Sequence, residues 1–188
     1  MKTYLTEHTL SNFELKKAQS IDELIPRTPA NCTFETPIGP IRIACDGLSI
    51  TSITTGLSEW IEDKQPASPL LRQAKQEILE FLDGTRKEFT FLWCISGTPF
   101  LNAVRQAACD IPYGQTMTYK QLAQAAGNPK AARAAAKAMS SNTLPLVIPC
   151  HRVIPSNGGI GRYSFAKEEE SKQMLLDMER NVLASEQA

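Results

Sequence analysis

The chain has 188 residues, of which 42% are hydrophobic, and its 20 basic and 20 acidic residues give a net charge of zero. This composition is typical of a globular protein with one substantial core or two small ones, and it excludes disordered and fibrous proteins. No apolar segment is long enough for a signal peptide or a membrane span, so we expect a protein of the prokaryotic cytoplasm, or of another intracellular location, without membrane association.

The first half of the chain is predicted to form a small mixed α/β domain. Residues 34–55 contain Pro-Ile-Gly-Pro and Asp-Gly turn signals between short alternating β-branched segments, which is typical of strands joined by a hairpin. Residues 68–82 carry apolar side chains at helical spacing, which predicts a helix. Ser68 is expected to cap this helix, with Pro69 at its first position and Gly84 just past its end.

The segment Ser-Gly-Thr-Pro-Phe at 96–100 is typical of a domain boundary. The residues that follow have helical periodicity up to Pro112 and Gly114. We therefore predict an α+β fold with two domains, residues 1–96 and residues 97–188. The first has a short antiparallel sheet, and the second is mainly helical.

Residues 116–142 predict a helix-turn-helix. A capping box of Thr118 and Gln121 is expected to begin the first helix, and Gly127 stands where its end needs a left-handed residue. The Asn-Pro pair at 128–129 is expected to cap and begin the second helix. Two helices separated by so few residues form a helix-turn-helix.

The predicted second helix has features of a DNA-binding helix. Lys130, Arg133 and Lys137 would lie on one face, and most of the other residues are alanine, so the backbone could approach another molecule closely. Residues 99–164 carry seven basic residues against one acidic residue, a local net charge of +6 that suits a polyanion. The alternative is a core helix, because alanine is also the best helix former. Together, charge and spacing favour DNA docking.

Residues 144–155, "LPLVIPCHRVIP", place a histidine directly after a cysteine. Pro149 biases Ile148 toward extended geometry, so Cys150 is expected after a short apolar strand or turn at the edge of a pocket. Neighbouring residues of a strand face opposite sides. His151 would therefore need a bridging water or a sharp turn to draw the proton from the thiol and leave the nucleophilic thiolate.

A carboxylate is expected to orient the histidine. Glu179, on the predicted amphipathic helix 171–183, is the candidate, while residues 168–170 and Asp177 remain open. The alternative is an inert buried cysteine, because reduced cysteine is among the most buried residue types. The five cysteines are scattered and lack a C-x-x-C pair, which indicates a reducing compartment and predicts neither a disulfide framework nor a metal site.

Residues 98–164, with the motif "PCHRV" at 149–153, resemble the DNA-binding domain of the O6-alkylguanine-DNA alkyltransferases, also called methylated-DNA-protein-cysteine methyltransferases. Residues 36–50 and the helix to Phe81 resemble the N-terminal domain of that family. The resemblance implies DNA repair by direct reversal. The alkyl group of O6-alkylguanine, with O4-methylthymine as a second candidate, would pass to Cys150 without a cofactor. The thioether formed has no carbonyl for water to attack, so one protein would act once.

The resemblance also implies roles for individual residues. Cys150 would accept the alkyl group, with His151 acting through a water, Glu179 completing the relay and Asn142 holding the turn that shapes the site. Arg133 would enter the base stack from the minor groove while Tyr119 presses on a phosphate, so that the damaged nucleotide flips out of double-stranded DNA. The implied base pocket comprises the carbonyls of Cys150 and Val153, hydrogen-bond donors Tyr163 and Ser164, and the side chains of Met139, Pro145 and Lys172.

The chain departs from the family pattern after Ser164. The family has a Gly-Gly pair and a Lys-Glu-Trp-Leu-Leu run there, whereas this chain reads "FAKEEESKQMLLDME", with an apparent insertion of two residues. We align Lys172 and Glu179 with the family lysine and glutamate, which keeps their spacing of seven. Phe165 and the acidic insert at 167–171 are expected to narrow the pocket rim and to favour methyl over bulky adducts.

Two other functions fit part of the pattern. A cysteine hydrolase would use the same Cys-His-carboxylate chemistry but would turn over and has no need of a DNA-binding helix. A lesion-sensing DNA-binding protein without catalysis would need the helices and the pocket but not the thiol. Because Cys150 is present, we expect the alkyltransferase, acting as a monomer.

Overall fold

The computed structural model describes residues 28–63, 66, 68–161, 163 and 168–187. The N-terminal part contains three antiparallel strands in the order β1-β2-β3: β1 (Ala30–Phe34), β2 (Ile41–Cys45) and β3 (Ile50–Thr55). The hairpin expected in 34–55 is β2-β3, and β1 precedes it. The weakly patterned residues 1–27 lie outside the described residues.

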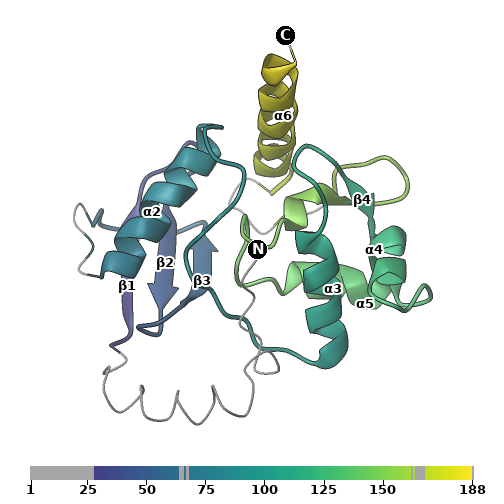
Figure 1. Ribbon diagram of the computed structural model, residues 1–188, viewed down its shortest axis with the longest axis horizontal. Helices are drawn as coiled ribbons and strands as arrows, with labels where there is room; N and C mark the ends of the chain where they lie inside the picture. The colour runs from purple at the N-terminus through teal and green to yellow at the C-terminus, as the bar shows by residue number, and fades with distance from the viewer. Residues whose placement is uncertain (1–27, 64–65, 67, 162, 164–167, 188) are drawn as a thin grey trace.

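Helix α2 (Pro69–Leu82) packs against this sheet (Figure 1). Its apolar stripe is buried against the strands, because side chains three or four positions apart share a face. One expectation is wrong: Ser68 lies at the N-cap position but its side chain makes no capping hydrogen bond. The buried side chains that form this part of the core include Leu71, Ala74, Ile78 and Phe81 from α2 and Ile41, Ile43 and Ile50 from the sheet.

The C-terminal part is mainly helical, so the predicted α+β class is confirmed. Its elements in chain order are α3 (Pro99–Cys109), β4 (Met117–Thr118), α4 (Tyr119–Ala125), α5 (Ala132–Ser140), the 3-10 helix η1 (Cys150–Arg152), β5 (Val153–Ile154) and α6 (Glu168–Glu186). Strands β4 and β5 form a short parallel pair. In Figure 1, α6 stands at the junction of the two parts.

Helices α4 and α5 form the predicted helix-turn-helix, with the expected Thr118-Gln121 capping box and Gly127 in the left-handed region at φ +85°. The expected start of the second helix is wrong. Asn128 Oδ1 accepts a hydrogen bond from the backbone N–H of Lys130 at 3.3 Å, so the Asn side chain stabilises a turn there instead of a helix. Helix α5 therefore begins at Ala132, and Lys130 precedes it.

Backbone hydrogen bonds join strand β3 to later parts of the chain. Ile50 pairs with the segment 92–94 on both sides, through Leu92 O at 2.8 Å and Cys94 N at 3.0 Å. Ile53 N–H donates to Thr143 O at 2.8 Å, which ties β3 to the turn that follows α5. The sheet thus contacts the backbone beside Asn142 directly.

Candidate active site

Cys150 opens the 3-10 helix η1 rather than following a strand. The turn before it is sharp, because the backbone of the buried Leu146 is left-handed, with φ +74°. This conformation is unfavourable for a residue with a side chain. Ile148 O then accepts the N–H of Cys150 at 2.7 Å. Cys150 thus follows a turn and not a strand, and it is buried, with 5% of its surface exposed.

Asn142 holds this turn through both ends of its amide. Its Oδ1 accepts from Leu144 N–H at 3.0 Å, and its Nδ2 donates to Ile148 O at 3.0 Å. The same Nδ2 lies 3.3 Å from Cys150 Sγ and donates to it. A hydrogen bond to sulfur stabilises the thiolate over the thiol, so Asn142 both shapes the turn and favours the nucleophile.

His151 and Glu179 are fully buried and in contact, with Nε2 and Oε1 2.8 Å apart. Arg152 donates to the same carboxylate from Nε and Nη2 at 2.9 to 3.1 Å, and Gly114 N–H donates to Glu179 Oε2 at 2.8 Å. Arg152 Nη1 also donates to Ile111 O at 2.8 Å. The carboxylate is thus surrounded by donors, as a buried charge requires.

The histidine ring has one polar atom left for chemistry. Its Nδ1 is buried and makes no hydrogen bond within the described part of the chain. Phe81 and Tyr163 approach the ring edge-on, each with centroids 6.3 Å away, so aromatic side chains restrict its orientation. With Nε2 held by Glu179, the Nδ1 side is the one available to a bridging water and the thiol.

The burial of these groups shifts their proton affinities in different directions. Burial raises the pKa of Cys150, while the Asn142 hydrogen bond and the Lys172 charge oppose the rise. Burial lowers the pKa of His151, although Glu179 opposes this. Burial acts to raise the pKa of Glu179, but the bonds and charges of His151 and Arg152 outweigh it and bring that pKa to about 2. Around neutral pH the carboxylate is therefore ionised.

Lys172 is a buried cation beside the thiol. Its Nζ donates to Val153 O at 2.7 Å, and none of its surface is exposed. Burial lowers the pKa of Lys172 to about 8, while the negative charge of Cys150 opposes this. Among the described residues the lysine makes no ion pair with a carboxylate, so the Cys150 thiolate is the charge best placed to balance it.

The predicted pocket residues that the structure describes are buried, and two of them are linked, because Lys172 Nζ donates to the carbonyl of Val153. Met139, Pro145, Val153 and Tyr163 are all buried, and burial together with the charge of Cys150 raises the pKa of Tyr163 well above its usual value. The carbonyl of Val153, expected to be part of the base pocket, is the one that accepts from Lys172. Two predicted residues, Ser164 and Phe165, lie outside the described residues.

The predicted DNA-contacting side chains lie on the helix-turn-helix. Lys130, Arg133 and Lys137 are exposed, but only Arg133 and Lys137 share a helical face, because Lys130 precedes α5. Tyr119 is half-buried at the start of α4, and burial followed by the charge of Cys150 raises its pKa. The Tyr119 hydroxyl, at the start of α4, therefore interacts electrostatically with the Cys150 thiol.

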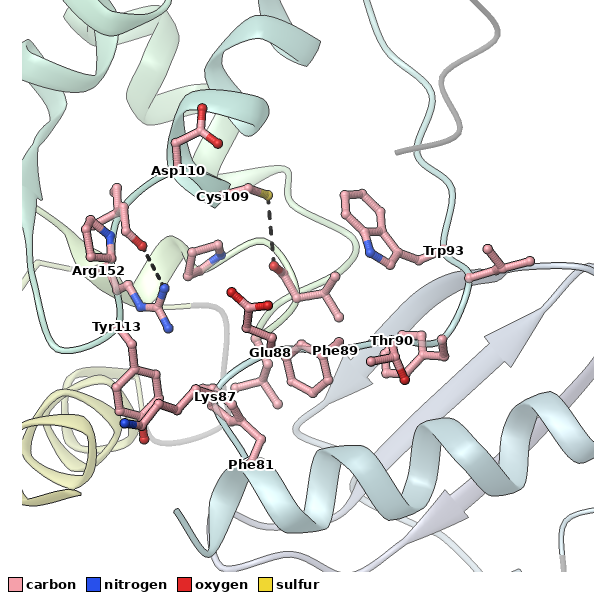
Figure 2. A pocket seen from close by; sticks show the side chains of 17 residues that line it. Phe81, Lys87, Glu88, Phe89, Thr90, Trp93, Cys109, Asp110, Tyr113 and Arg152 are labelled. Carbon is pink, nitrogen blue, oxygen red and sulfur yellow. Dashed lines mark hydrogen bonds between the residues drawn. The ribbon is translucent and has the colours of Figure 1, made fainter. Parts of the chain in front are cut away.

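A cavity of about 700 Å³ lies on another side of the active-site segment (Figure 2). It runs between the segment 87–93, which follows α2, and the C-terminal part, where Pro149 and Arg152 line it. Cys109 faces it, with Sγ 4.0 Å from Val147 O. Its lining includes neither Cys150 nor His151, so this cavity is not the base pocket that the sequence predicts.

No helix in the described part of the chain is long and apolar enough to cross a membrane. No group of three or more His, Cys, Asp or Glu residues in the described ranges is arranged to hold a metal ion.

The sequence reasoning missed Arg152 and Gly114. Arg152 lies inside the PCHRV motif, and an arginine within such an apolar segment is a sequence signal for a buried acidic partner. Gly114 was assigned only a helix-breaking function, and its N–H donation to Glu179 has no sequence signal. These two residues complete the shell of donors around the carboxylate.

Comparisons with known proteins agree on one family. Residues 99–181 match the family described as "6-O-methylguanine DNA methyltransferase, DNA binding domain". The constitutive methylated-DNA--protein-cysteine methyltransferase of Bacillus subtilis is 39% identical over 155 residues, which cover 79% of this chain and 93% of the relative. The Methanosarcina barkeri methyltransferase is 36% identical over 80% of this chain and 96% of the relative. The crystal structure of Mycobacterium tuberculosis OGT in complex with DNA matches with a TM-score of 0.70 and 31% identity, covering 81% of this chain and 93% of that one.

Proposed function

This chain belongs to the methylated-DNA-protein-cysteine methyltransferase family, and we propose that Cys150 is the cysteine that accepts the methyl group. The reaction of the protein is the transfer of a methyl group from O6-methylguanine in DNA to a protein cysteine, and it binds damaged DNA. The observation that carries the choice of Cys150 is the Asn142 amide donating to its sulfur at 3.3 Å, beside the buried His151-Glu179 pair.

The transfer is a single displacement. A water between the thiol and His151 Nδ1 carries the Cys150 proton to the histidine, whose other nitrogen is held by the ionised Glu179. The thiolate attacks the methyl carbon, a carbon–sulfur bond forms, and the bond from that carbon to O6 breaks with its electron pair going to the guanine. The guanine then takes up one proton from water, and the protonated His151 returns its proton to water. A hydrogen bond from Tyr163 toward O6 stabilises the developing charge.

The site is consumed in this reaction. The product is a thioether, which offers water no carbonyl to attack, so each molecule transfers one methyl group. His151 contributes by accepting a proton, and Lys172 by balancing the thiolate inside a buried site. O4-methylthymine is a second candidate substrate for the same displacement.

The DNA-binding mode is also proposed. Arg133 on the exposed face of α5 enters the base stack from the minor groove, and Tyr119 at the start of α4 presses on the neighbouring phosphate, so the damaged nucleotide leaves the stack. Lys130 and Lys137 add charge that attracts the backbone. Residues 97–188 serve as the catalytic DNA-binding domain and residues 1–96 as its support, and the protein acts as an intracellular monomer.

Mass spectrometry tests the proposal. The protein is mixed with a duplex that carries one O6-methylguanine, and its peptides are compared before and after the reaction. One methyl group on the Cys150 peptide, in stoichiometric yield with guanine restored, supports the proposal. A methyl group on another cysteine overturns the assignment of Cys150. Binding without transfer identifies a lesion-sensing protein, and repeated turnover identifies a hydrolase.

A further inference from the structure

Arg105 is a buried charge that the reaction described above does not use. It lies on α3 with 6% of its surface exposed, and burial lowers the pKa of its guanidinium. No carboxylate among the described residues pairs with it. Keeping an arginine buried without such a partner is costly, so the contacts that it does make require an explanation.

The guanidinium joins two backbone segments that are distant in sequence. Nη1 donates to Ser96 O at 2.9 Å in the segment before α3, and Nη2 donates to Ser141 O at 3.2 Å at the end of α5. The fit is tight at Gly97, where an added Cβ would lie 2.9 Å from Nη1. Ser141 O lies at a helix C-terminus, whose carbonyls favour a cation.

The hydrogen bond from Arg105 Nη2 to Ser141 O is one peptide group away from Asn142, which holds the turn before Cys150. Ser141 O and the nitrogen of Asn142 belong to the same planar unit, so holding the carbonyl fixes the plane from which the Asn142 side chain projects. Ile53 N–H holds the carbonyl of Thr143, the next but one, at 2.8 Å. The backbone on both sides of Asn142 is therefore held, by α3 on one side and by β3 on the other.

We propose that Arg105 is a positioning residue, which holds the Ser141-Asn142 peptide so that the Asn142 amide donates to the Cys150 sulfur. This inference rests on the proposed role of Cys150 as the methyl acceptor. Arg105 touches neither thiol nor DNA in this scheme. Its loss turns the Asn142 amide away from Sγ, so the thiolate loses a donor and the methyl transfer slows.

The test compares the wild type with Arg105→Met. Methionine keeps the length and apolar contacts of the side chain but removes the charge and both donors. The pH midpoint of Cys150 alkylation by iodoacetamide, followed on its peptide, should rise by about half a pH unit or more. Transfer from an O6-methylguanine duplex at pH 7 should slow about tenfold. Affinity for undamaged duplex should stay within about twofold, because Arg105 is not a phosphate contact.

A double-mutant cycle with Asn142→Ala separates positioning from general destabilisation. If Arg105 acts through Asn142, Arg105→Met changes the rate less than about twofold once the amide is gone. Arg42→Met, at an exposed arginine on β2, is the matched control and should behave as wild type. Arg105→Lys, which keeps a cation but can reach both carbonyls only imperfectly, should give an intermediate midpoint. If the methionine variant does not fold, the cycle is run with the lysine variant.

Two results overturn the inference. One is an unchanged midpoint and rate in a folded Arg105 variant. The other is an effect of equal size with and without Asn142. Both presuppose a wild type that methylates Cys150, so a wild type that fails to do so refutes the proposed function instead.

Discussion

Glu179 Oε1 and His151 Nε2 lie 2.8 Å apart in a place where neither side chain has any exposed surface. A buried ionised carboxylate is stable only while its donors remain, and here they are His151, Arg152 and the Gly114 N–H. The pair therefore connects the acid stability of the protein with its reactivity.

Glu179→Gln tests this connection. The pKa of Glu179 is lowered to about 2 in the folded protein, below its usual value. The folded state then binds fewer protons than the unfolded state at acid pH, so the stabilisation is present above about pH 4.5 and is lost as the pH falls toward about 2. The variant should lose about 3 kcal/mol of unfolding free energy at pH 7 and much of the pH dependence below pH 4.5, measured by urea denaturation. Asp177→Asn, at an exposed site on the same helix, is the control; a glutamine variant with the wild-type acid profile would contradict the assignment.

Lys172→Met should separate stability from activity. With its pKa lowered to about 8, Lys172 holds fewer protons in the folded than in the unfolded state between about pH 8 and its usual pKa of 10.5, so stability rises with pH across that window. The methionine variant should lack this rise and unfold at higher urea concentration at pH 7. Its methyl transfer should slow, because the Cys150 thiolate loses the cation whose charge lowers the thiol pKa. Equal slopes of stability against pH in both proteins would show that the lysine is not desolvated.

Cys150→Ser should abolish transfer and spare DNA binding. Oxygen at this position is a far weaker nucleophile near neutral pH, so no methyl group should appear on the protein. Affinity for a duplex with O6-methylguanine should change less than about threefold, because the phosphate contacts remain. Gel-shift titration and peptide mass spectrometry measure the two effects. Methylation of Cys109 or another cysteine in the variant would show that Cys150 is not the sole acceptor.

Arg133→Ala should slow repair of duplex DNA but not of the free base. In the proposed binding mode Arg133 enters the base stack, so its removal raises the cost of flipping the nucleotide, and transfer from duplex should fall about tenfold or more. The reaction with free O6-methylguanine base needs no flipping and should be unchanged. Lys137 lies one turn along the same face. Lys137→Ala should instead reduce the slope of log affinity against log salt concentration by about one, since one counterion fewer is released on binding. Equal losses with duplex and free base would place Arg133 in a structural role.

Much of the helix-turn-helix was predictable because its signals are local. The Thr118-Gln121 capping box and the left-handed Gly127 depend on neighbouring residues alone. Helix α5 was predicted to begin too early, since the side chain of Asn128 can cap a helix or stabilise a turn, and only the surrounding structure decides between them.

The hydrogen bonds from Arg152 and Gly114 to Glu179 could not be predicted from the sequence, for a different reason. Arg152 and Glu179 are 27 positions apart, and Gly114 is 65 positions from Glu179, so only the packing of α6 brings them together. The left-handed Leu146 was equally hidden, because an apolar residue in that conformation contradicts its local preference. Local rules fail at such functional turns, where tertiary contacts override them.

The residues that support the Cys150 turn lie far apart in sequence, and this separation affects the order in which the protein folds. The turn that presents Cys150 takes its supports from β3, α3 and α6, which are separated by most of the described chain. Contacts of such long range form late, after the entropy of closing large loops has been overcome. A partly folded chain should thus lack both the Asn142 hydrogen bond to the thiol and the His151-Glu179 pair beside it. The ability to transfer a methyl group should therefore appear in the same kinetic phase in which α6 docks.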